Sequence, residues 1–249
     1  MTSPTAVLAV RNTVRIARNP SALVGGLITP VVLMLAIWSV FGRAMEANGL
    51  DYGHYLVPGI TLQAIIFAAA GSAGAIGTDR TSGVLDRQRT LPISAAAPIL
   101  GRLVADLVRS VLSVVTATVV GFTLGFRLKG AASELLAYAL LVVAFAVAVS
   151  LLFDAVALAA SSPAAAISLV QAATIPLVLL STSYAPSTLL PDWAARIIEH
   201  LPVSAVGEAL RQASDGALTT PVLIEAAAWA FAIGASGLLL GARAFRRTA

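Results

Sequence analysis

Charged side chains gather in one stretch of this sequence, between two long apolar runs. The whole chain has 16 Lys and Arg and 12 Asp and Glu. Ionised groups are costly inside hydrocarbon, so a dense group of them is expected at or beyond a membrane surface, where it can bind a soluble partner. The stretch is residues 79–110, and its charged residues are Asp79, Arg80, Asp86, Arg87, Arg89, Arg102, Asp106 and Arg109.

Four charged residues at or within expected membrane spans are candidates for ion pairs. Arg102, Asp106 and Arg109 share one stripe of a helix, so Asp106 can be matched by its own neighbours. A charge costs roughly 2.5 to 3.5 kcal/mol at the bilayer centre, which favours pairing. Asp154 has no local partner, and we predict that it pairs with Arg109 across two helices. A proton relay through Asp154 is the alternative.

Nucleotide-binding, metal-binding and hydrolytic sites are not visible in the sequence. A P-loop needs a lysine directly after a glycine, and the single lysine, Lys129, precedes Gly130 instead. The only histidines, His54 and His200, lie outside the expected spans. No pair of carboxylates shares a membrane depth, so the chain is not expected to be an enzyme, and no metal or cofactor is expected to bind it.

Composition places the chain in a membrane. Of its residues 58% are hydrophobic and only 11% are charged, whereas soluble domains carry roughly 25% charged residues. Cysteine is absent, so neither disulfides nor thiolate metal sites can form. The net charge of +4 does not indicate nucleic acid, because no basic run has interleaved aromatics.

The apolar runs predict an all-α membrane protein with a single transmembrane domain over residues 1–249. Each run is long enough to cross a bilayer as a helix. We expect an N-terminal surface helix over 4–19, a charged loop over 79–98 and short outer helices over 191–214. The six expected spans are about 21–42, 56–78, 103–126, 134–160, 164–184 and 222–241.

The distribution of basic residues predicts that both termini are cytoplasmic. Lysine and arginine are enriched on the cytoplasmic side of membrane proteins. With six spans, the side of the termini carries most of the basic residues, and the charged loop lies on that same side. These residues are Arg11, Arg15, Arg18, Arg80, Arg87, Arg89, Arg102, Arg109, Arg243, Arg246 and Arg247.

Two segments outside the spans have amphipathic patterns. In the surface helix, the stripe of Arg11, Arg15 and Arg18 runs beside a stripe of valines, which suits a helix lying on a membrane. Among the outer helices, Trp193 and Ile197 share an apolar face. In the next helix, Glu208 and Arg211 stand at i and i+3. These four residues form either an outer gate or an interfacial segment with no gating role.

Small residues recur at four-residue spacing in Gly121–Gly125 and Gly237–Gly241. Such spacing lets helices approach closely. We predict packing within the chain rather than a seam between two chains.

The order of several motifs resembles the permease subunits of the type-2 ABC exporter family, in particular the daunorubicin-resistance-like drug-efflux permeases of actinobacteria. HYLVPGI over 54–60 opens the second span, and DRTSGVLDRQRTLPIS over 79–94 is followed by ILGRLVADLVR. Residues 161–211, from SSPAAAISL to GEALR, are similar to the fifth span, the outer helices and the closing motif. The likeness extends over nearly the whole chain.

The resemblance implies that the charged loop contains a coupling helix, which docks into a groove of a separate ATP-binding subunit. The N-terminal surface helix would touch the same subunit. Where many relatives carry Glu, this chain has the shorter Asp79 and Asp86. The implied docking residues are Asp79, Arg80, Gly83, Val84, Leu85, Asp86, Arg87 and Arg89, with Arg11, Arg15 and Arg18 beside them.

An exporter in the bacterial cytoplasmic membrane is the mechanism that the resemblance implies. Two permeases, identical or homologous, would join two ATP-binding subunits, which hold ATP and Mg. Closure of these subunits would open a path for an amphipathic or lipid-like compound along spans one, two and five. Polar side chains that either meet such a cargo or bond to a neighbouring helix are Gln63, Ser72, Gln171, Thr174 and Ser181.

Two other functions remain compatible with the sequence. An ion-coupled secondary transporter would use Asp154, although such proteins commonly have repeated halves and no repeat is visible here. A membrane scaffold without transport activity is the third possibility.

Overall fold

The computed structural model describes residues 4–18, 20–84 and 96–247, and these residues form helices and turns without a strand. The prediction of an all-helical chain is therefore confirmed for the described residues. In chain order the elements are α1 (Pro4–Ala17), α2 (Pro20–Ala47), α3 (Tyr52–Thr81), α5 (Ala96–Thr123), α6 (Ala132–Ala159), α7 (Pro163–Leu179), the 3-10 turn η1 (Ser187–Leu189), α8 (Asp192–Ile198), α9 (Pro202–Asp215) and α10 (Thr220–Arg247).

Five of these helices are long and apolar enough to cross a membrane. The candidate spans are Gly26–Ala47, Tyr52–Asp79, Leu100–Thr123, Ala132–Ala159 and Thr220–Gly241. The chain is thus a multi-pass membrane protein. The run expected at 164–184 forms α7, a helix of 17 residues, which extends about 25 Å and falls short of the roughly 30 Å hydrocarbon core.

Helix α3 is the centre of the bundle. It packs against α2, α5, α6, α7 and α9, and 82% of its most apolar window is buried, against 17% for α2 and for α10. The main core joins Leu62 and Ile65 of α3 to Phe145 of α6 and Val206 of α9. The side chains of α3 therefore form much of the surface against which the surrounding helices pack.

Helix α7 runs alongside α3 in the opposite direction. A Cβ atom added at Gly77 would lie 2.8 Å from Cα of Pro163, and one added at Gly59 would lie 2.8 Å from Cα of Ser183. These two approaches stand at opposite ends of α3, about 27 Å apart along its axis. The segment from Pro163 to Ser183 therefore follows most of the length of the bundle.

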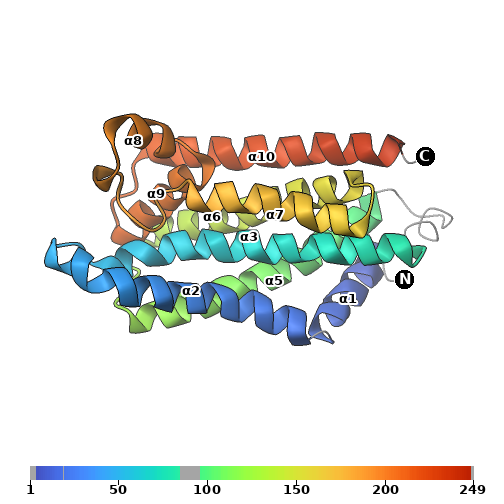
Figure 1. The fold of residues 1–249 in the computed structure, drawn as a ribbon, viewed down its shortest axis with the longest axis horizontal. Coiled ribbons are helices and arrows are strands. Elements are labelled where there is room, and N and C mark those ends of the chain that lie inside the picture. The colour runs from blue at the N-terminus through green and yellow to red at the C-terminus, as the bar shows by residue number, and fades with distance from the viewer. Residues whose placement is uncertain (1–3, 19, 85–95, 248–249) are drawn as a thin grey trace.

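Both ends of the described chain lie at the same end of the bundle (Figure 1). This end, here called the α1 end, contains α1, the last turns of α3 and the C-terminal turns of α10. The opposite end, the α8 end, contains α8, α9 and the beginning of α3 (Figure 1). α1 turns away from the direction of α2 and packs against α5.

The prediction that the small residues pack within the chain is confirmed for Gly237. α10 packs on α6, and a Cβ atom at Gly237 would lie 2.6 Å from the backbone nitrogen of Leu152. Only a glycine allows the two backbones to come this close. The neighbouring Gly241 faces Ala155 at an ordinary 3.6 Å.

Candidate functional site

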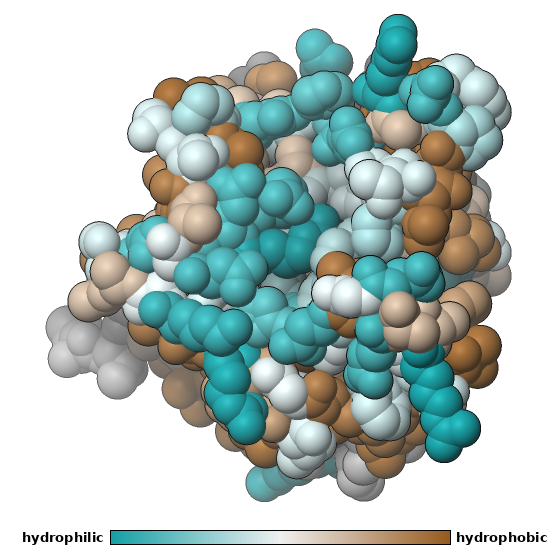
Figure 2. Space-filling model, turned by 90° about the vertical axis from the view of Figure 1, so that its left-hand side faces the viewer, coloured by the Kyte–Doolittle hydropathy of each residue, from teal (hydrophilic) through white to brown (hydrophobic). Residues whose placement is uncertain are grey.

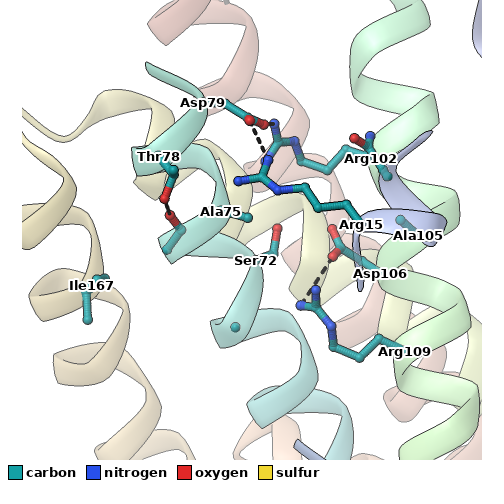
Figure 3. Close-up of a pocket in the computed structure, with 13 residues that line it drawn as sticks. Arg15, Ser72, Ala75, Thr78, Asp79, Arg102, Ala105, Asp106, Arg109 and Ile167 are labelled. Carbon is teal, nitrogen blue, oxygen red and sulfur yellow. Dashed lines mark hydrogen bonds and ion pairs between the residues drawn. The ribbon is translucent and has the colours of Figure 1, made fainter. Parts of the chain in front are cut away.

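A cluster of buried ion pairs occupies the α1 end. Asp79, in the last turns of α3, is 3% exposed and accepts a hydrogen bond from Arg102 of α5 at 2.8 Å. Its other carboxylate oxygen accepts from Arg15 of α1 at 2.5 Å. Figure 3 shows both guanidinium groups converging on this single carboxylate. One side chain therefore joins three helices.

The position of α1 depends on a close contact with α5. A Cβ atom at Gly101 would lie 2.7 Å from the Cβ atom of Leu8, so the absence of a side chain lets α1 lie flat on α5. Gly101 precedes Arg102, and the same packing brings Arg15 and Arg102 to the two carboxylate oxygens of Asp79. The carboxylate of Asp79 therefore links α3 to both α1 and α5.

A second group of charges lies deeper along α5. Arg109 stands 3.7 Å from Asp106 and donates a hydrogen bond to the backbone carbonyl of Ala68 at 3.0 Å. Asp154 of α6 accepts a hydrogen bond from Ser72 of α3 at 2.6 Å. The expected pair between Asp154 and Arg109 is thus replaced by two separate contacts. Arg109 instead contacts Asp106 of its own helix and the backbone of α3.

A cavity of about 380 Å³ opens between these groups. Arg15, Asp79, Arg102, Asp106 and Arg109 line it, together with small residues of α3 and Ile167 of α7 (Figure 3). Within the described residues, Oδ2 of Asp106 has no hydrogen-bond partner. The cavity therefore contains buried charges of both signs close to one another.

The implied docking residues divide into four groups. Asp79 and Arg15 bond to each other inside the bundle, so they are not free to bind another subunit in this arrangement. Arg11 is exposed on α1, and Arg18 is exposed directly after its end. Arg80 lies in α3, and Gly83 and Val84 directly follow that helix, Gly83 at a left-handed φ of +69°. Leu85, Asp86, Arg87 and Arg89 lie outside the described residues.

The expected pathway residues have unequal surroundings. Thr174 and Ser181 donate hydrogen bonds to carbonyls of their own chain segment, at Val170 and Val178. Ser72 is engaged with Asp154. Gln171 is exposed on α7, whereas Gln63 is 2% exposed and its amide has no partner among the described residues.

The α8 end carries a second polar site. Figure 2 shows hydrophilic side chains gathered around a hollow at this end, with hydrophobic side chains along parts of the rim. A cavity of about 360 Å³ here is lined by residues that include Tyr55, Glu199, His200, Glu208, Arg211 and Glu225. Trp193 and Ile197 of α8 are exposed, at 72% and 59%, as an apolar face at a membrane interface would be.

Arg211 is the central residue of this second site. It bonds to Glu208, three residues earlier in α9, at 3.1 Å. It also donates a hydrogen bond to the hydroxyl of Thr182 at 3.2 Å, and its guanidinium lies 4.4 Å from the ring centre of Tyr55. The contacts with Tyr55 and Thr182 were not predicted, since the three residues are far apart in the sequence.

An ion pair between His200 and Glu225 gives a test of the α8 end. The ring Nδ1 of His200 lies 2.7 Å from the Glu225 carboxylate. This hydrogen bond, and then the negative charge of Glu225, raise the pKa of His200 above its ordinary value. Such a contact stabilises the fold below the unfolded-state pKa, and the contribution is lost as pH rises through the folded-state pKa. Glu225→Gln is expected to return the pKa of His200 towards about 6.5.

The measurement is an NMR titration of the two histidine rings in detergent micelles. His54→Asn assigns the remaining signal to His200. An unchanged His200 pKa in Glu225→Gln would show that the two side chains do not interact in solution.

A metal site requires several ligating side chains close together. Within the described ranges, no group of three or more His, Cys, Asp or Glu side chains can hold a metal ion. The buried charges bond to one another and to the backbone, as residues that brace or transmit movement do.

Comparison with known proteins links this geometry to a family. Residues 4–214 match the profile of the ABC-2 type transporter. The chain is 28% identical over 197 residues to the daunorubicin resistance ABC transporter permease protein DrrB1 of Streptomyces coeruleorubidus, covering 79% of this chain and 70% of that protein. It is 29% identical over 231 residues to the doxorubicin resistance ABC transporter permease protein DrrB of Mycobacterium tuberculosis, covering 86% and 80%. A putative transport permease of Porphyra purpurea is 24% identical over 208 residues, covering 82% and 71%.

Proposed function

The chain belongs to the ABC-2 type transporter family, and on that premise we propose that it is the membrane subunit of an ATP-driven exporter. It moves a hydrophobic or amphipathic compound out across the bacterial cytoplasmic membrane. A separate subunit binds ATP with Mg and hydrolyses it. Two such subunits act with two permeases, the second of which is a copy or a homologue of this chain.

The ion pairs of Asp79 are the observation that carries this proposal. The segment proposed to dock on the ATP-binding subunit follows α3 and precedes α5. Asp79 of α3 precedes this segment in the chain, and Arg102 of α5 follows it. Asp79 is bonded to Arg102 and also to Arg15 of α1. A push on the segment therefore reaches three helices as one unit, which favours a rigid movement over local bending.

Six membrane crossings fit the arrangement better than five. An odd number of crossings places the two termini on opposite sides, whereas α1 and the end of α10 lie at the same end (Figure 1). We propose that α7 and the turn after it supply the remaining crossing. The basic residues then place the α1 end in the cytoplasm.

The proposed pathway lies along α2, α3 and α7, between the two permeases. α7 exposes Ile167, Gln171, Ile175 and Leu179, a mainly apolar surface with one amide. Such a surface suits an amphipathic compound. Drug resistance in the names of the relatives supports a drug-like cargo.

Copurification with an ABC ATP-binding subunit tests this function. The tagged permease is co-expressed with an ABC ATP-binding subunit, and ATPase activity is measured with and without amphipathic drugs. Asp86→Ala combined with Arg87→Ala is expected to reduce drug-stimulated ATPase activity by at least roughly fivefold. A factor of about five corresponds to the lower end of typical coupling free energies between two sites.

The control is Glu46→Ala combined with Arg43→Ala, which removes one acid and one arginine from exposed positions at the α8 end. It is expected to leave the stimulation intact. Drug transport driven by a proton gradient, without any ATP-binding subunit, would contradict the exporter and favour the ion-coupled alternative.

A further inference from the structure

Helix α1 presents a basic and an apolar surface that no other part of the described chain covers. Val7, Val10 and Val14 are 54%, 62% and 40% exposed. Arg11 and Arg18 are exposed beside them. We propose that this surface binds anionic phospholipid, with the valines in the acyl region and the two arginines on headgroup phosphates.

The order of side chains around α1 matches a membrane interface. At about 100° per residue the three valines fall on one stripe, and Arg11, Arg15 and Arg18 fall on the stripe next to it. Leu8, on the other side of the arginines, faces Gly101 of α5. The helix therefore has a protein face, a basic edge and an apolar face in succession. Interfacial helices place such a basic edge at the depth of the phosphates.

The basic edge lines an open groove among the described residues. Arg11, Val14, Arg15 and Arg18 line a shallow groove of about 640 Å³. Of the three arginines, Arg15 is bonded to Asp79. Neither Arg11 nor Arg18 forms an ion pair within the described residues. Two unpaired guanidinium groups beside an apolar stripe are complementary to an anion that carries acyl chains.

Binding at this surface reaches the coupling cluster through Arg15. This residue shares the groove with Arg11 and Arg18 and at the same time bonds to Asp79 of α3. A phosphate near Arg15 competes with Asp79 for the guanidinium. Anionic lipid is thus placed to influence the helix that precedes the proposed docking segment.

The orientation of α1 towards the cytoplasmic leaflet rests on the proposed function, but the lipid contact itself is tested without an ATP-binding subunit. The chain contains no cysteine, so Val10→Cys gives one attachment point for a polarity-sensitive dye. The full chain in neutral detergent micelles is titrated with phosphatidylglycerol or with phosphatidylcholine. Dye emission is expected to shift to the blue at far lower phosphatidylglycerol than phosphatidylcholine.

Arg11→Gln combined with Arg18→Gln leaves Arg15 and its bond to Asp79 in place. It is expected to raise the phosphatidylglycerol needed for half of the shift by roughly 30-fold, from the usual contribution of each basic residue near an anionic surface. The matched control, Arg43→Gln combined with Arg196→Gln, removes the same charge from exposed positions at the α8 end. It is expected to keep the wild-type midpoint.

Three results would overturn the proposal. Equal midpoints for the two lipids would show that α1 does not select charge. Inorganic phosphate producing the same shift would indicate a free-anion site. A dye that responds only to an added ATP-binding subunit would assign the surface to that protein. A lipid preference in this titration supports the inference whether or not an ATP-binding subunit is later found to bind the chain, so the two proposals can fail separately.

Discussion

Asp79→Ala is expected to lower the free energy of unfolding by about 2 to 3 kcal/mol. Removal of one partner from a buried pair typically costs 3 to 5 kcal/mol, because the other charge stays buried. Here the Arg102 side chain is 16% exposed and that of Arg15 is 40% exposed, and water stabilises them in part. Thermal unfolding of the purified chain in detergent, followed by circular dichroism, measures the change.

Asp192→Ala serves as the control for this variant. Asp192 is an exposed acid of α8 with no ion-pair partner among the described residues. Its removal is expected to change stability by less than about 0.5 kcal/mol. Asp79→Asn combined with Arg102→Gln is expected to recover part of the loss, since no buried charge remains unpaired on that side. Equal losses for Asp79→Ala and Asp192→Ala would argue against the cluster.

A second variant, Asp79→Asn, separates binding of the ATP-binding subunit from transmission of its movement. If Asp79 joins the docking segment to the bundle, Asp79→Asn retains the ATP-binding subunit in copurification and loses drug-stimulated ATPase activity. Loss of copurification would instead place Asp79 in the docking contact that the family resemblance implies.

Gly237→Ala is the second substitution with a large expected effect, a loss of about 2 kcal/mol. The new methyl group would meet the backbone nitrogen of Leu152 at 2.6 Å and the carbonyl carbon of Leu151 at 2.7 Å. Backbone atoms of a helix move only together, so α10 must shift away from α6, and overpacking of this kind costs 1 to 3 kcal/mol. Unfolding in detergent is again the measurement.

Gly241→Ala is the matched control, one helical turn further along α10. There the methyl group meets the Cβ atom of Ala155 at 3.6 Å, an ordinary contact. Since alanine favours a helix over glycine, this variant is expected to be neutral or more stable by up to about 1 kcal/mol. A similar destabilisation by both substitutions would mean that α6 and α10 do not approach most closely at Gly237.

The elements of this protein were largely predictable from the sequence. Apolar runs of about 20 residues can be recognised from local sequence. A helix in lipid must satisfy its own backbone hydrogen bonds and needs apolar side chains along its whole length. The amphipathic α1, the short helices α8 and α9, and the Glu208–Arg211 contact follow from helical spacing alone. α7 is the exception, since its helix ends at Leu179, earlier than the apolar run predicted.

The partners of the charged residues were decided by the tertiary structure. Arg15 and Asp79 are 64 residues apart, and Ser72 and Asp154 are 82 residues apart. No periodicity connects such positions, so the sequence could show that Asp154 needs a partner but not that Ser72 provides it. Which side chains meet depends on α3 lying between α5, α6 and α7. That arrangement depends on small residues. Glycines along α3, Gly101 on α5 and Gly237 on α10 let particular pairs of helices approach closely, and helix pairs without such residues stay further apart.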